Sequence, residues 1–115
     1  MKILFVENHS VFAAQVIPLF LSDHEVTVVP GLAEGRRAVS AAEFDLLLVD
    51  YDLDDGKGEE LVGEIRANHS RLPIIGVSSH EAGNRALLKA GANAVCSKMN
   101  FDQIQTVIQK LIGTE

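Results

Sequence analysis

The sequence predicts an α/β domain in which five parallel strands form one doubly wound sheet with helices packed on both faces. Two observations support this fold class. Five short apolar runs recur along the 115 residues, and most are continuous rather than alternating, as in strands covered on both faces. Segments with helical spacing of apolar residues separate the runs, so strand and helix alternate five times. The runs are KILFV (2–6), EVTVV (25–29), FDLLLV (44–49), PIIGV (73–77) and AVCS (94–97).

The first two predicted helices follow the first two strands. Ser10 is a suitable N-cap for a helix with apolar residues at helical spacing. Pro18 lies inside that pattern, so we expect the helix to kink or end near it. The second helix, over residues 32–42, has the weakest pattern because it contains Gly35.

Three further helices are predicted after the third, fourth and fifth strands. Residues 58–68 place apolar side chains on one face. Ser79 can cap a helix that runs to about Ala90 and closes at Gly91. The last helix has the clearest apolar stripe, which consists of Phe101, Ile104, Val107, Ile108 and Leu111.

Length and composition restrict the class of protein. The chain suffices for one domain, residues 1–115, that buries roughly two-thirds of its unfolded surface. Ten basic and sixteen acidic residues give a net charge of −6, which disfavours nucleic acid as a partner. Cys96 is the only cysteine, so a disulfide framework is excluded and a cytoplasmic location is expected. The sequence contains no recognisable signal peptide or membrane span.

Polar residues follow four of the five predicted strands. They are Glu7 and Asn8 after the first strand, Asp50 after the third, Ser78 after the fourth and Lys98 after the fifth. In a doubly wound sheet the ligand site lies at the carboxyl ends of the strands. Acidic groups, a hydroxyl and an amine therefore converge on one edge, and such a pocket suits Mg²⁺ together with a phosphoryl group.

The segment after the third strand is strongly acidic. LLLVDYDLDDGKG, residues 46–58, contains Asp50, Asp52, Asp54 and Asp55. Like charges this close repel, and without a counter-ion some would keep their protons. A calcium loop is excluded because it requires glycine at the position of Asp55 and a bidentate glutamate at the position of Leu61. Asp54 and Asp55 are expected to be solvated turn residues that lead to Gly56 and Gly58.

These strand-end residues resemble the pattern of a response-regulator receiver domain, over essentially the full length of the chain. That family has an acidic pair after strand one, a phospho-accepting aspartate after strand three, a Thr or Ser after strand four and a lysine after strand five. The matching positions are Glu7 with Asn8, Asp50 in VDYDLDDGKG, Ser78 in PIIGVSSH and Lys98 in AVCSKMN. The spacing to Leu53 and Gly58, and the AGA before strand five, also fit. The resemblance implies a flavodoxin-like strand order, 2-1-3-4-5.

The resemblance also implies a function. Asp50 would take a phosphoryl group from a sensor histidine kinase or a phosphotransfer protein, and the domain would then switch a downstream partner. Mg²⁺ would be held by Glu7, Asn8, Asp50 and the main-chain carbonyl of Asp52. Such a domain is not an enzyme in the ordinary sense, because it catalyses only its own phosphorylation and dephosphorylation.

Four other roles follow from the same resemblance. Lys98 would pair with the acceptor carboxylate before transfer and with a phosphoryl oxygen afterwards. Ser78 would move its hydroxyl onto another phosphoryl oxygen and displace the loop that follows. The side chain of Asp52 and His80 would flank the pocket and modulate dephosphorylation, although His80 is equally well interpreted as an exposed residue near a helix cap.

Three positions depart from the family pattern. Asn8 replaces an aspartate and brings no charge, so we expect weaker Mg²⁺ binding than in a typical receiver. Val95 stands where many members carry Tyr or Phe, and Met99 stands where they carry proline. These departures keep open a second function, a pseudo-receiver that acts by protein contact with weak or lost phosphorylation.

A phosphatase is the third interpretation. The Asp-Tyr-Asp segment at 50–52 resembles the DxD motif of haloacid-dehalogenase-type phosphatases. Those enzymes place DxD on an early strand and need a further acidic motif beyond the lysine, whereas only Asp102 and Glu115 follow Lys98 here. The sequence therefore favours a receiver.

Overall fold

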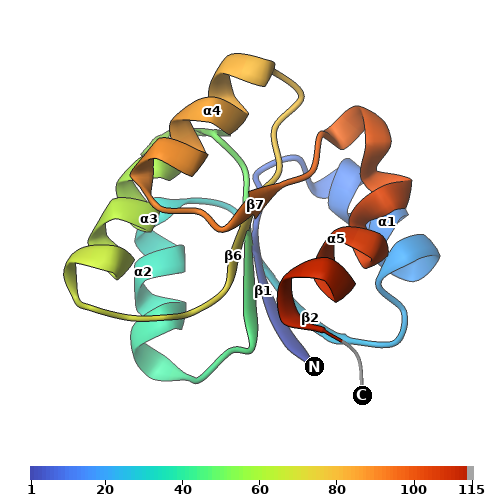
Figure 1. Ribbon diagram of the computed structural model, residues 1–115, viewed down its shortest axis with the longest axis horizontal. Helices are drawn as coiled ribbons and strands as arrows, with labels where there is room; N and C mark the ends of the chain where they lie inside the picture. Colours follow the sequence, from blue (N-terminus) through green and yellow to red (C-terminus); the bar gives the residue numbers. More distant parts are fainter. Residues whose placement is uncertain (114–115) are drawn as a thin grey trace.

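Figure 1 shows the computed structural model, which describes residues 1–113, so Glu115 lies outside the described residues. Among residues 1–113, no helix has the length and apolar character needed to cross a membrane. The elements in chain order are β1 (Lys2–Val6), α1 (Ser10–Phe20), β2 (Glu25–Val29), α2 (Leu32–Ala41), β3 (Leu46–Val49), β4 (Asp52–Leu53), β5 (Gly56–Lys57), α3 (Gly58–Ala67), β6 (Ile74–Gly76), α4 (Glu81–Ala90), β7 (Ala94–Val95), the 3-10 helix η1 (Lys98–Gln103) and α5 (Ile104–Ile112).

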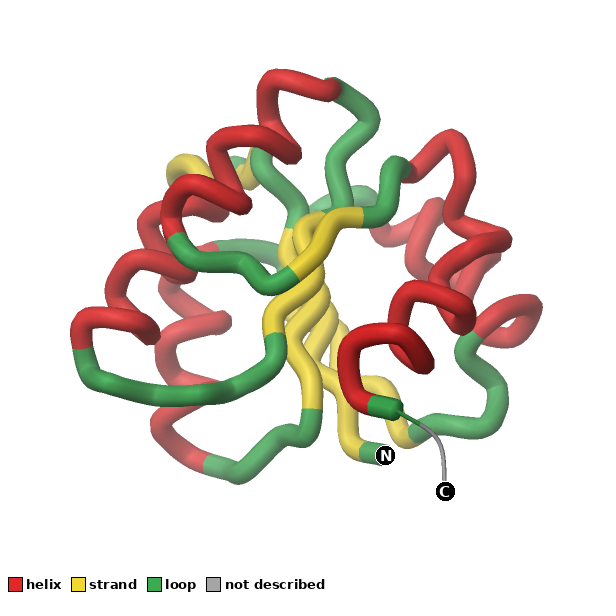
Figure 2. Tube along the Cα trace, viewed as in Figure 1, coloured by secondary structure: helices red, strands yellow, loops and turns green. Residues whose placement is uncertain are grey.

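Five of the strands form one parallel sheet in the order β2-β1-β3-β6-β7. Strands β4 and β5 form a separate hairpin, so β6 and β7 are the fourth and fifth strands of the sheet along the chain. The predicted fold class and the predicted order 2-1-3-4-5 are therefore confirmed. Helices α2, α3 and α4 cover one face of the sheet, and α1 and α5 cover the other (Figure 1). Figure 2 shows the strands as a twisted central layer between these two groups of helices.

The central strands are buried because helices cover both of their faces. Ile3 and Phe5 of β1 point into the core shared with α1 and α5, whereas Leu4 and Val6 point into the core shared with α2 and α3. Strand β3 is buried along its whole length. The continuous apolar runs that predicted these strands thus correspond to burial on both faces.

Strand β2 does not fit the expectation of burial on both faces. It lies at the edge of the sheet, and Glu25, Thr27 and Val28 are exposed. An edge strand has only one neighbour, and β-branched residues favour a strand there too. Three predicted strands are also shorter than their apolar runs, because β3, β6 and β7 begin or end inside them.

The N-cap predicted for α1 is wrong. Ser10 is the first helical residue, and His9 occupies the N-cap position without a side-chain cap. The helix begins there because the Glu7 carboxylate already accepts the backbone N–H of His9 and turns the chain. Pro18 acts as expected, since α1 ends at Phe20.

The N-cap predicted for α4 is also displaced. His80, not Ser79, occupies that position, because the Ser78 hydroxyl oxygen accepts the His80 N–H at 3.1 Å. Gly91 closes α4 as predicted, with a φ of 128° that favours glycine. The last predicted helix starts as the 3-10 turn η1 and continues as α5.

The acidic segment after β3 contains a hairpin that the sequence pattern did not reveal. Asp52 pairs with Lys57, and Leu53 pairs with Gly56, in an antiparallel ladder of two short strands. Gly56 has a φ of 145°, which side-chain-bearing residues rarely adopt. Asp54 and Asp55 therefore lie in a tight turn, as expected.

Asp55 is more than a solvated turn residue. Its carboxylate accepts the backbone N–H groups of Leu32 at 2.8 Å and Ala33 at 3.1 Å. These are the first N–H groups of α2, which have no partner inside the helix. Asp55 thus caps α2 from a distant segment while it remains an exposed turn residue, as expected.

We expect Asp55→Ala to lower the thermal midpoint by about 5 °C at neutral pH, because two N–H groups lose their acceptor. The hydrogen bonds from Leu32 and Ala33 lower the pKa of Asp55 below its usual 3.8. This stabilisation is therefore present above the unfolded pKa and lost as the pH falls through the lower folded pKa.

Thermal unfolding of wild type and Asp55→Ala across pH measures this contribution. The difference in thermal midpoint between wild type and Asp55→Ala should be constant above about pH 5 and shrink below about pH 4. Asp23→Ala, at an exposed position in the turn before β2, is the control. Equal midpoints for the two variants would contradict the capping role.

Candidate functional site

The carboxyl ends of β1, β3 and β6 bring three polar side chains to one edge of the sheet. Glu7 follows β1, Asp50 follows β3 and Ser78 lies just beyond β6. Their exposed fractions are 1%, 3% and 1%, respectively, so all three are buried. Lys98 reaches the same edge from the start of η1. The edge is therefore a buried polar site, at the end of the sheet opposite to the N-terminus in Figure 1.

Lys98 joins the two buried carboxylates. Its Nζ donates to Asp50 Oδ2 at 2.9 Å and to Glu7 Oε2 at 3.0 Å. Burial raises the pKa of Glu7; the hydrogen bond from Lys98 lowers this pKa, and the charge of Asp50 raises it further. The Lys98 side chain is itself only 12% exposed, so these ion pairs are weakly screened by water.

Two oxygens at this edge are suited to a metal ion. Glu7 Oε1 and Asn8 Oδ1 are both shielded from solvent, and neither accepts a hydrogen bond from residues 1–113. Glu7 Oε1 does lie 2.9 Å from Lys98 Nζ, but the aligned hydrogen bond goes to Oε2. Carboxylate and amide oxygens are the ligands that Mg²⁺ prefers, so the residues fit this cation.

His9 adds a nitrogen beside these oxygens. Its Nδ1, a Glu7 oxygen and an Asp50 oxygen all lie within 4.8 Å of one another. The same nitrogen is 3.1 Å from Glu7 Oε2 and 3.4 Å from Lys98 Nζ. The ring is exposed to solvent and occupies the Lys98 side of the site.

The loop that carries Ser78 is held by Asn84 of α4, a residue that the sequence pattern did not reveal. Asn84 Oδ1 accepts the Ser78 N–H at 3.1 Å, and Asn84 Nδ2 donates to the Ser78 carbonyl at 3.2 Å. The only sequence signal is an asparagine inside a helix, where its propensity is poor. His80, expected beside the pocket, is exposed at the start of α4.

The Asp52 side chain forms an ion pair with a neighbouring lysine. Lys57 forms an ion pair with the Asp52 carboxylate, and the hydrogen bond from Lys57 lowers the pKa of Asp52. The Lys57 ammonium also lies 5.1 Å from the centre of the Tyr51 ring. Asp54 is an exposed turn residue, as expected, and it also accepts a hydrogen bond from Asn8 Nδ2 at 3.0 Å.

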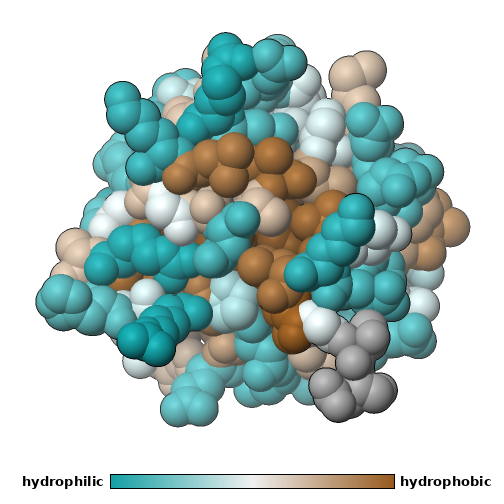
Figure 3. Space-filling view, viewed as in Figure 1, coloured by the Kyte–Doolittle hydropathy of each residue, from teal (hydrophilic) through white to brown (hydrophobic). Residues whose placement is uncertain are grey.

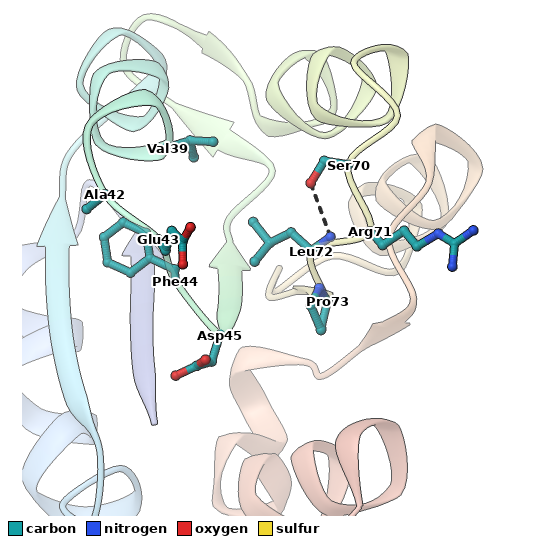
Figure 4. A pocket seen from close by; sticks show the side chains of 9 residues that line it. All are labelled: Val39, Ala42, Glu43, Phe44, Asp45, Ser70, Arg71, Leu72 and Pro73. Atoms are coloured by element: carbon teal, nitrogen blue, oxygen red, sulfur yellow. Dashed lines mark hydrogen bonds between the residues drawn. The ribbon is translucent and has the colours of Figure 1, made fainter.

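A cavity of about 510 Å³ lies away from this edge. It lies at the amino ends of β3 and β6, between the segments 42–45 and 70–73 (Figure 4). Its side chains, which include Phe44, Arg71 and Pro73, share no residue with the strand-end site.

Apolar side chains gather on another surface, formed by α4, β7 and α5 (Figure 3). Among the apolar residues of these helices, Leu88 of α4 and Ile112 of α5 are exposed, and Val107 and Leu111 of α5 are partly buried. Val95, where the family often has an aromatic residue, is also only partly buried. This apolar face lies beside the loop that carries Ser78, because α4 follows that loop directly.

The family model that describes the response regulator receiver domain matches residues 3–109. The chain belongs to this family. The sensor protein GacS of Pseudomonas syringae pv. syringae is 32% identical to the receiver over 97 residues, which cover 77% of this chain and 11% of that protein. This receiver therefore spans about a tenth of the length of the curated relative it matches.

Solved structures agree with the family. The receiver domain of the sensor histidine kinase PA1611 from Pseudomonas aeruginosa PAO1 has a TM-score of 0.87 at 28% identity, with 98% of both chains covered. That structure has a magnesium ion coordinated in the active-site cleft. Response regulator TrrA from Thermotoga maritima shares the fold, with a TM-score of 0.85 at 21% identity over 96% of this chain and 97% of that chain.

Gly83 leaves the space in which Ser78 and Tyr51 pack against α4. A Cβ at position 83 would lie 2.7 Å from the Ser78 hydroxyl oxygen and 3.0 Å from Tyr51. Gly63 of α3 is the matched control, because a Cβ there would meet nothing within 4 Å.

We expect Gly63→Ala to raise the free energy of unfolding by about 0.5–1 kcal/mol, the usual gain for alanine over glycine in a helix. Gly83→Ala should lose this gain and destabilise the receiver, because Ser78 or Tyr51 must move. Urea unfolding measures both changes. An equal gain for the two variants would contradict the packing constraint at Gly83.

Proposed function

We propose that the receiver accepts a phosphoryl group on Asp50 from a phospho-histidine. The observation that carries this proposal is a buried carboxylate at the carboxyl end of β3, 2.9 Å from the Lys98 ammonium, in a chain of the receiver family. A carboxylate oxygen of Asp50 attacks the phosphorus, and the nitrogen–phosphorus bond breaks. The electron pair of that bond returns to the donor imidazole, which takes up a proton.

The strand-end residues are suited to hold Mg²⁺ during this transfer. Glu7, Asn8, Asp50 and the main-chain carbonyl of Asp52 are the proposed ligands, and the shielded oxygens of Glu7 and Asn8 support this assignment. Bound Mg²⁺ supplies positive charge that offsets the charge on the transferring oxygens. The magnesium in the cleft of the PA1611 receiver domain is consistent with such a site.

Lys98 and Ser78 respond to the new group. Lys98 releases the carboxylate oxygen of Asp50 as the acyl phosphate forms, and it pairs with a phosphoryl oxygen instead. Ser78 donates its hydroxyl hydrogen to another phosphoryl oxygen. This movement displaces the loop that carries Ser78, and because Asn84 ties that loop to α4, it displaces α4 too. Asp52 and His80 flank the site and modulate how long the phosphoryl group persists.

The relatives of this receiver support the proposed phosphoryl donor. A sensor histidine kinase or a phosphotransfer protein is the proposed donor, since the PA1611 domain belongs to such a kinase. A downstream protein binds the apolar face of α4, β7 and α5, which adjoins the moving loop. We place the receiver, as a single domain over residues 1–115, in the cytoplasm. It acts by switching rather than by turnover of a substrate.

Intact mass spectrometry tests the assignment of Asp50. Incubation with acetyl phosphate and Mg²⁺ should add the mass of one phosphoryl group to wild type and none to Asp50→Asn. The matched control is Asp52→Asn, which removes a neighbouring carboxylate of the same segment and should still be labelled.

Two results would contradict the proposal. Labelling that survives in Asp50→Asn would exclude Asp50 as the acceptor. Unlabelled wild type that also shows no spectral change with Mg²⁺ and beryllofluoride would favour a pseudo-receiver that acts by contact alone.

A further inference from the structure

We propose that Asp54 is a positioning residue of the metal site, because it orients the amide of Asn8 so that the carbonyl oxygen is available to the cation. This inference rests on the proposed function, since it concerns the Mg²⁺ that would serve phosphoryl transfer to Asp50. It assigns a role to a residue that the sequence predicts to be solvated.

The two ends of the Asn8 amide have different environments. Nδ2 donates to Asp54 Oδ1 at 3.0 Å. Oδ1 is shielded from solvent and accepts no hydrogen bond from the described part of the chain. The neighbouring Glu7 oxygen Oε1 is also shielded from solvent, and its one polar neighbour is the Lys98 ammonium at 2.9 Å, without an aligned hydrogen bond. A shielded amide oxygen with no hydrogen bond, beside a buried carboxylate oxygen, is an arrangement that a bound cation satisfies.

An asparagine at this position can adopt two amide orientations, whereas the two oxygens of an aspartate are equivalent. Its amide can rotate and present either an oxygen acceptor or an NH₂ donor to the site. Without a cation, the carboxylates of Glu7 and Asp50 attract the donor end. Mg²⁺ would then meet the wrong end of the amide, and rotation would cost part of the binding free energy.

Asp54 favours one of the two orientations because its carboxylate accepts the hydrogen bond from Asn8 Nδ2, which leaves Asn8 Oδ1 for the cation. Its own position is held by the hairpin, in which the turn joins β4 to β5. Asp55, the next residue, is tied to α2 by two backbone hydrogen bonds. The acceptor for Nδ2 is thus anchored independently of the metal site, and it lies 46 residues from Asn8 in sequence.

Isothermal titration with Mg²⁺ tests this role in two backgrounds. With Asn8 present, Asp54→Ala should weaken the affinity roughly five-fold, the value of one hydrogen bond of about 1 kcal/mol. Asp54→Asn should stay closer to wild type, because its amide keeps an oxygen acceptor. With Asn8→Asp, which has no amide to orient, Asp54→Ala should leave the affinity unchanged or raise it.

The second background separates orientation from simple charge. If Asp54 acts only as a nearby negative charge, Asp54→Ala weakens Mg²⁺ binding in both backgrounds, and the inference is overturned. It is also overturned if Asp54→Ala has no effect beside Asn8, or if wild type binds no Mg²⁺. Asp23→Ala is the charge-matched control and should not change the affinity.

Fluorescence of Tyr51, the only tyrosine in a chain without tryptophan, gives a second measure of binding beside Asp50. Thermal unfolding without Mg²⁺ shows whether the variants remain folded. The proposed function fails separately: with saturating Mg²⁺, Asp54→Ala should still be labelled by acetyl phosphate. Wild type that acetyl phosphate does not label at Asp50 would refute the proposed function. An unchanged Mg²⁺ affinity in Asp54→Ala would refute only the proposal that Asp54 orients the Asn8 amide.

Discussion

The ammonium group of Lys98 holds together two carboxylates that would otherwise repel each other inside the protein. Glu7 and Asp50 end neighbouring strands, so the register of β1 and β3 forces their side chains into the same space. Both are nearly inaccessible to water, and two buried like charges without a counter-ion would take up a proton. Lys98 arrives from beyond β7 and places its positive charge between them, at 2.9 Å from Asp50 Oδ2 and 3.0 Å from Glu7 Oε2.

The acidic segment after β3 is organised by hydrogen bonds and ion pairs of its aspartates, and three of the four partners lie elsewhere in the chain. Each of its four aspartates has a different one: Asp50 pairs with Lys98, Asp52 with Lys57, Asp54 with Asn8 and Asp55 with the first turn of α2. Charges that are crowded in the sequence are therefore separated in their interactions. The same contacts fix the loop around the proposed acceptor, because the hairpin turn is tied both to β1 and to α2.

The sequence predicted what depends on periodicity and on strand ends. Continuous apolar runs located the strands, and the residues after them located the site, because parallel strands bring their carboxyl ends to one edge. Individual side-chain hydrogen bonds between segments have no such signature. The Asp55 cap, the Asn84 bonds to the Ser78 loop and the Asn8–Asp54 bond each join segments that no local pattern relates. The exposure of β2 was likewise hidden, since an apolar run does not say which strand lies at the edge.

The dependence of the site on Lys98 is tested most directly by the stability of Lys98→Met across pH. This change keeps the apolar stem and removes the charge. The free energy of unfolding should fall by about 3 kcal/mol near pH 7, because two buried carboxylates lose the ammonium group that lies between them. The loss of stability should shrink as the pH falls, since protonation of a carboxylate removes the repulsion. At neutral pH, Mg²⁺ should restore part of the lost stability. A variant as stable as wild type at neutral pH, or a loss that is the same at every pH, would contradict the account.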